Sequence, residues 1–161
     1  MANDTVALSV FVNSDVVTVG IFDDSGVQGS KSFPGLPKHI HGIGARFAAF
    51  SQWINQLIER QKYGSLICVA PRYSVNSRAF HEADYQSRLL GIAQAAFAVR
   101  KLRVDEVDWS EVYAMAGVRR LEESQDVLLD AAARNGVKLS APCVAVAYWT
   151  LLAGKRGKSD E

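Results

Sequence analysis

The chain has 161 residues, of which 48% are hydrophobic and 22% are charged, a composition typical of a globular domain with its own core. Its 18 Lys and Arg against 17 Asp and Glu leave a formal charge of +1. No overall field therefore attracts nucleic acid or an anionic membrane, and any basic surface must be local. The amino terminus lacks a signal-peptide pattern and no apolar run is long enough to cross a bilayer, so we expect a cytoplasmic protein with no membrane partner.

Short β-branched and apolar runs fill the chain from Thr5 to Ser32. Turn-forming segments at 13–15 and 23–26 interrupt them, which predicts a meander of antiparallel strands. Apolar residues at three- and four-residue steps from Ile43 to Ile58 predict an amphipathic helix. The run 66–70 is apolar without alternation, which predicts a strand buried on both faces.

Helices and strands alternate in the rest of the chain. The sequence predicts a helix over 77–101, a strand over 102–107, helical residues at 109–116, a helix over 123–134, an edge strand at 137–139 and a helix over 144–153 that begins near Pro142 and ends at Gly154. We expect one domain over 1–154 and a charged flexible tail over 155–161. This order predicts an α/β fold with a mixed sheet of five to six strands and helices on both faces.

Four short patterns occur in a definite order along the chain. They are Ala7-Leu8 with Val19 to Asp24, Gly44 to Phe47, Val69 to Arg72, and Ala131 to Gly136 leading into Val144 to Ala147. In order and spacing they resemble the RuvC-like Holliday junction resolvases, particularly the compact phage and prophage members. The resemblance extends from Ala7 to Leu152 and implies an RNase H-like fold and a phage or prophage origin.

The resemblance also locates the positions at which such a nuclease carries its acids. In that family an Asp ends the first strand, a Glu precedes an Ala-Pro pair after the central strand, and Asp residues begin the last helix, together holding two Mg²⁺ ions. The matching positions here are Ser9 (or Phe11), Val69, Ala141, Pro142 and Val146. None supplies a carboxylate, so we expect a catalytically inactive pseudo-nuclease with no metal cofactor. An active endonuclease with other metal ligands is the alternative.

The histidines and cysteines carry no clear site. His39 and His41 have no third ligand at a plausible metal-binding spacing. Cys68 and Cys143 have no CxxC partner, so we expect both to be buried, reduced thiols.

Two loops carry arginine side chains, and one of them also an asparagine, that could bind phosphates. Arg72, Asn76 and Arg78 follow the central strand, and Arg119 and Arg120 precede the helix at 123–134. The resemblance places both loops on the DNA side. The expected partner is then branched or duplex DNA. The competing interpretation is that these arginines are ordinary solvated residues. A further alternative is that the protein is a protein-interaction module with no nucleic-acid role.

The helix at 77–101 has more apolar surface than one sheet face requires. In RuvC-like proteins this helix lies at a dimer interface, so the resemblance implies a homodimer. The expected interface residues are Tyr85, Leu89, Ile92 and Phe97. Packing in the chain's own core is the competing explanation.

Overall fold

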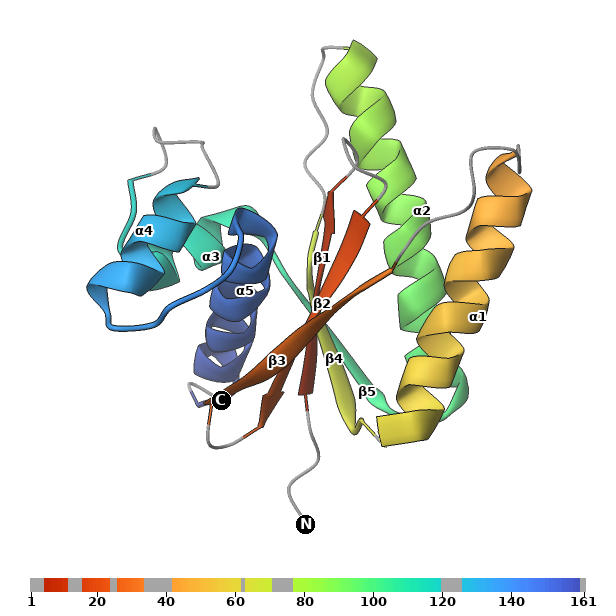
Figure 1. The fold of residues 1–161 in the computed structure, drawn as a ribbon, viewed down its shortest axis with the longest axis horizontal. Helices are drawn as coiled ribbons and strands as arrows, with labels where there is room; N and C mark the ends of the chain where they lie inside the picture. The colour runs from red at the N-terminus through yellow and green to blue at the C-terminus, as the bar shows by residue number, and fades with distance from the viewer. Residues whose placement is uncertain are drawn as a thin grey trace.

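The fold is a single twisted sheet between two layers of helices (Figure 1). The computed structural model describes residues 5–11, 16–23, 26–33, 42–61, 63–70, 77–119 and 126–159, and for most of the first three strands it describes the backbone alone. No helix within these ranges is both long and apolar enough to span a membrane.

The sheet combines an antiparallel and a parallel part. Strands β1 (Thr5–Phe11), β2 (Val16–Asp23) and β3 (Gly26–Phe33) form the meander that the sequence predicts. Strand β4 (Ser65–Val69) pairs with β1 in parallel, and β5 (Arg103–Val107) pairs with β4 in parallel. The described sheet thus has five strands in the order β3-β2-β1-β4-β5.

The edge strand expected at 137–139 does not form. Val137 donates its backbone N–H to the carbonyl oxygen of Ala132 at 2.9 Å, which closes the end of helix α4 (Asp126–Arg134). The donor that a strand would need is therefore already used at a helix end.

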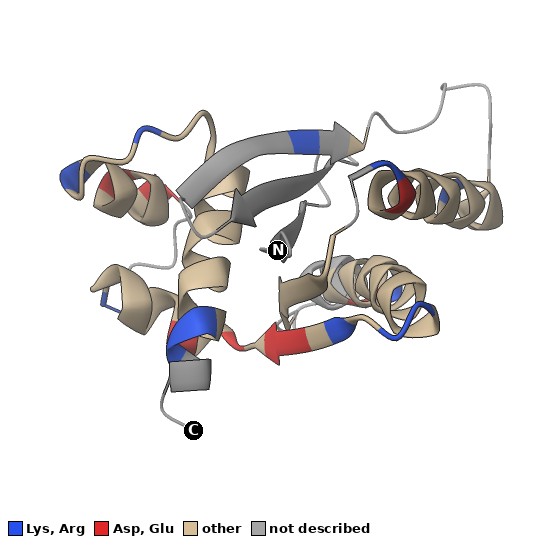
Figure 2. Cartoon of the chain, turned by 90° about the horizontal axis from the view of Figure 1, so that it is seen from below, with Lys and Arg blue, Asp and Glu red and all other residues tan. Residues whose placement is uncertain are grey.

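Helices cover both faces of the sheet. Helices α1 (Ile43–Gln61) and α2 (Ser77–Val99) lie on one face, and α3 (Trp109–Ala116), α4 and α5 (Pro142–Ser159) lie on the other. The view along the parallel strands from their amino ends shows the sheet between these two layers (Figure 2).

Strand β4 is buried on both faces, as its continuous apolar run predicts. Leu66 and Cys68 pack in the core formed with α1 and α2, whereas Ile67 and Val69 pack in the core formed with α5. These four side chains are at most 6% exposed. The parallel centre of the sheet therefore provides apolar surface to both helix layers.

The expected dimer interface on α2 needs correction at two positions. Leu89 is 3% exposed and Phe97 is fully buried, and both pack in the core between α2 and the sheet. Their apolar character is explained by the chain's own core. Tyr85, whose ring stacks on Phe47, and Ile92 are partly exposed, so an interface through these two residues stays a prediction.

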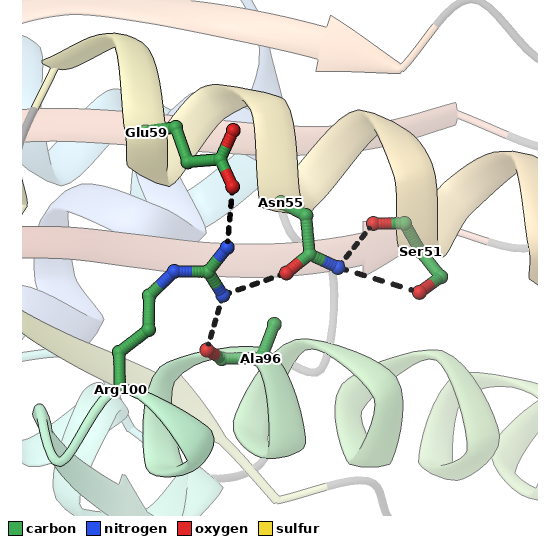
Figure 3. A network of polar contacts seen from close by, with 5 residues as sticks. All are labelled: Ser51, Asn55, Glu59, Ala96 and Arg100. Carbon is green, nitrogen blue, oxygen red and sulfur yellow. Dashed lines mark hydrogen bonds and ion pairs between the residues drawn. The ribbon is translucent and has the colours of Figure 1, made fainter.

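A polar cluster joins the carboxyl-terminal parts of α1 and α2 (Figure 3). The Arg100 guanidinium donates to Asn55 Oδ1 at 2.6 Å and to the Ala96 carbonyl at 2.8 Å. It also lies 3.1 Å from Glu59 Oε1, and Asn55 donates in turn to the Ser51 carbonyl at 2.7 Å. These contacts fix the end of α2 beside the end of α1.

Helix α5 is longer than predicted. It continues through Gly154 to Ser159, so the first five residues of the expected tail are helical. A Cβ at Gly154 would lie 2.7 Å from Ile67 Cδ1 and 2.9 Å from Cγ2. The glycine thus allows close approach of the helix to β4 and does not mark a helix end.

Candidate functional site

The positions that match the nuclease acids begin at the carboxyl ends of β1 and β4. These strands run in parallel, with Leu8 opposite Cys68, so Ser9 and Val69 follow side by side at the same end of the sheet. Beyond them, the Ala70 N–H donates to the Val107 carbonyl at 2.8 Å, which brings the end of β5 to the same place. The expected convergence of strand ends is therefore present in the backbone.

Helix α5 begins close to this end of the sheet and crosses the face of β1 and β4. The Ala141 carbonyl accepts the N–H groups of Val144 and Ala145, each at 3.1 Å. Pro142 is the first helical residue, where proline costs no hydrogen bond and its fixed φ suits the helix.

The side chains at two of these positions are packed as core. Val69 is 6% exposed and Val146 is 1% exposed, and both belong to one apolar cluster with Ala145 and Leu128. Ala141 and Pro142 are partly buried. For Ser9 the structure describes only the backbone, in β1.

This arrangement does not fit a magnesium site. Mg²⁺ requires oxygen ligands in near-octahedral geometry, and valine, alanine and proline side chains provide none. Within the described ranges, no group of three or more His, Cys, Asp or Glu side chains could hold a metal ion. The described acid Asp84 forms an ion pair with Arg88 at 3.2 Å on the surface of α2.

Of the five predicted phosphate-binding residues, Arg119 has a described side chain. It is exposed and lies just after Gly117, at which α3 ends. Arg78 lies in the first turn of α2, with its backbone alone described. Arg72, Asn76 and Arg120 lie outside the described residues.

Cys68 of β4 takes part in a polar contact that the sequence did not indicate, in which Gln94 of α2 joins β4 to β5. Gln94 Nε2 lies 3.3 Å from Cys68 Sγ and donates to Glu106 Oε2 at 2.9 Å. Burial raises the pKa of the Cys68 thiol to about 11, and the neighbouring Glu106 and Asp105 carboxylates act in the same direction against the hydrogen bond from Gln94. The thiol is therefore neutral and unreactive near pH 7.

Neither cysteine forms a disulfide, but their environments differ. Cys68 is fully buried, in agreement with the sequence prediction. Cys143 is partly exposed in the first turn of α5, so the prediction of burial is wrong there.

Comparison with solved structures shows the fold. RuvC of Thermus thermophilus aligns with 96% of each chain, a TM-score of 0.69 and 11% sequence identity. The same protein in complex with a Holliday junction substrate aligns with 96% of each chain, a TM-score of 0.67 and 10% identity. The yeast mitochondrial Holliday junction resolvase aligns with 96% of this chain and 83% of its own, with a TM-score of 0.57 and 8% identity. No family model matches the sequence, and no curated protein does.

Proposed function

We propose that this chain is a RuvC-like pseudo-nuclease of phage or prophage origin that binds branched DNA without cutting it. The observation that carries the proposal is the burial of Val69 and Val146, at 6% and 1% exposure, at positions where the fold would otherwise hold metal-binding acids. Their side chains fill the space with apolar atoms, and within the described ranges no group of three or more His, Cys, Asp or Glu side chains could hold a metal ion.

Loss of the acids also changes the electrostatics at the carboxyl end of the sheet. A cluster of carboxylates repels phosphate unless metal ions neutralise it. With valine, alanine and proline at these positions, a phosphodiester can approach in the absence of a divalent cation. We therefore expect DNA binding by this protein to persist in EDTA.

Arginine side chains in the two adjoining loops supply the phosphate contacts in this proposal. Arg119 is exposed next to the end of α3, and Arg72, Arg78 and Arg120 are its proposed partners. The fold similarity to a RuvC bound to a Holliday junction supports DNA as the ligand class.

Salt-dependent binding of a fluorescent four-way junction tests this proposal. The variant that replaces Arg72, Arg78, Arg119 and Arg120 by Gln should bind more weakly. The slope of log affinity against log salt should flatten by about 0.9 for each phosphate on the duplex arms that the variant no longer neutralises. An unchanged slope contradicts binding at this site, and a protein that binds no DNA at low salt is better explained as a protein-interaction module.

A further inference from the structure

A second group of basic residues lies toward the opposite end of the sheet, where Figure 2 shows blue segments at the ends of α1 and α5, after α2 and at the start of β5. It comes from the ends of three helices and the start of one strand. We call it the basic edge, and it consists of Arg60, Arg100, Lys101, Arg103, Lys155 and Arg156.

The fold brings these residues from both faces of the sheet toward the end at which β4 begins with Ser65 (Figure 1). Arg60 lies in the last turn of α1, directly before β4. Arg103 stands opposite Ser65 in the parallel pairing of β4 with β5. Lys155 follows Gly154, which packs against the Ile67 side chain of β4. Residues far apart in the sequence therefore lie toward the same end of the sheet.

Two of these cations form ion pairs, one between the ends of α1 and α2 and one within β5. Arg100 lies 3.1 Å from Glu59, and Arg103 lies 2.8 Å from Asp105. Arg60, Lys101 and Lys155 are exposed and form no ion pair with a described acid. The two pairs neutralise Arg100 and Arg103, and of the other four cations Arg60, Lys101 and Lys155 face solvent.

The charge at the basic edge is large relative to that of the chain. Among the described side chains of the basic edge other than Arg156, five basic groups and the two paired acids, Glu59 and Asp105, leave a formal charge of +3, whereas the whole chain carries +1. The rest of the chain is therefore net acidic. A basic residue in the last turn of a helix interacts favourably with the helix dipole, which accounts for Arg60 but not for Arg103 at the start of a strand.

We propose that the basic edge binds the phosphodiester backbone of duplex DNA, as a second contact at the end of the sheet opposite the candidate site. The choice of DNA over another polyanion rests on the proposed function, whereas the surface itself is given by the described side chains. Unpaired Lys and Arg on one edge attract the phosphate backbone without regard to sequence. An arm of bound DNA that runs from the carboxyl end of the sheet along the molecule to the amino end would contact this surface.

The test neutralises the three unpaired cations together. In the full chain, Arg60→Gln, Lys101→Asn and Lys155→Gln remove these charges. Asparagine suits position 101 because the backbone there is left-handed, with φ 59°. The matched control is Lys31→Gln, Arg134→Gln and Lys138→Gln, which removes three exposed charges from β3 and from around the end of α4. Binding of a labelled 30-base-pair duplex and of a four-way junction is measured against salt for both variants.

The expected result is a weaker complex with a flatter salt slope for the basic-edge variant alone. Removing a cation that neutralises one phosphate should lower the slope of log affinity against log salt by about 0.9. If wild type and variant have equal affinity at 1 M salt, the affinity of the variant at 0.1 M salt is then about eight-fold lower than that of the wild type. Equal losses in both triple variants overturn the inference and leave the proposed function standing. A wild type that binds duplex and junction equally, with loss only in the basic-edge variant, supports the inference and contradicts the proposed function. Absence of DNA binding by the wild type at low salt overturns both the inference and the proposed function. This holds even if the basic edge binds another polyanion such as polyglutamate.

Discussion

Cys68 shows how burial controls the chemistry of a single residue. Its thiol is enclosed between α2 and the sheet, and its pKa is raised to about 11 from 9.0, mainly by burial. The folded state therefore favours the neutral thiol more strongly than the unfolded chain does. The resulting stabilisation is fully present below pH 9 and is lost as the pH rises toward 11.

We predict that the wild type loses stability relative to Cys68→Ala between pH 9 and 11. The difference in unfolding free energy should change by at most about 1.4 kcal/mol per pH unit, because one proton is involved. Urea denaturation at several pH values measures it, and the common titration of Tyr and Lys cancels in the comparison. A difference that stays constant over this range would show that the thiol does not titrate as its burial requires.

Val69 is the residue at which the proposed loss of catalysis is most direct. Its side chain packs with Val146 in the α5 core, so Val69→Glu places a carboxylate among apolar atoms. At pH 7 we expect a loss of about 3 kcal/mol or more of unfolding free energy. The loss should be smaller at pH 5, because burial raises the carboxyl pKa and protonation removes the charge. Val69→Ala, which only leaves a cavity, should show no such pH dependence.

Magnesium provides the second readout for this position. Because no group of three or more His, Cys, Asp or Glu side chains within the described ranges could hold a metal ion, 10 mM Mg²⁺ should leave the melting temperature of Val69→Glu unchanged. A clear rise with Mg²⁺, absent from Val69→Ala, would mean that neighbouring acids complete a metal site.

At the scale of elements, the packing of α5 on β4 depends on one glycine. Ile67 is fully buried, and a Cβ at position 154 would meet it at 2.7 and 2.9 Å. Gly91 in α2 is the matched comparison, since it is also helical but exposed, with nothing within 4 Å of its added Cβ.

We predict opposite effects of the two Gly→Ala substitutions. Gly91→Ala should stabilise the protein by about 0.5–1 kcal/mol through helix propensity. Gly154→Ala gains the same propensity but overfills the contact with Ile67, at a cost of about 1–3 kcal/mol, so it should be neutral to destabilising. Urea denaturation decides, and equal stabilisation by both would show that Ile67 moves aside freely.

The elements show what the sequence could predict. The turn residues located the meander, and the continuous apolar run located β4 as a strand buried on both faces. The predicted end of α5 was wrong because a tertiary contact decided it, and the predicted strand at 137–139 was wrong because a local helix cap uses the Val137 N–H. Gly154 serves a close approach to Ile67, and the Val137 N–H is used by the cap of α4. The contact of Gly154 has no local sequence signal, whereas Gly136, with φ 79°, is a local signal for the cap of α4.

The whole molecule has two ends with different electrostatic character. At the carboxyl ends of β1 and β4, four of the five positions matching nuclease acids are apolar, namely Val69, Ala141, Pro142 and Val146. At the amino ends of β4 and β5, six basic side chains collect. The first feature was visible in the sequence through the resemblance, whereas the second was not, because Arg60, Lys101 and Lys155 are brought together only by the fold.

A single assay can read DNA binding and DNA cleavage by the same sample. A labelled four-way junction is incubated with excess protein in Mg²⁺, in Mn²⁺ and in EDTA, and each reaction is divided between a native gel and a denaturing gel. We predict a retarded complex in all three conditions and an intact strand on the denaturing gel. Metal-dependent incision at defined positions, abolished by changing one remaining Asp or Glu, would contradict binding without cleavage, as would the absence of any complex at low salt.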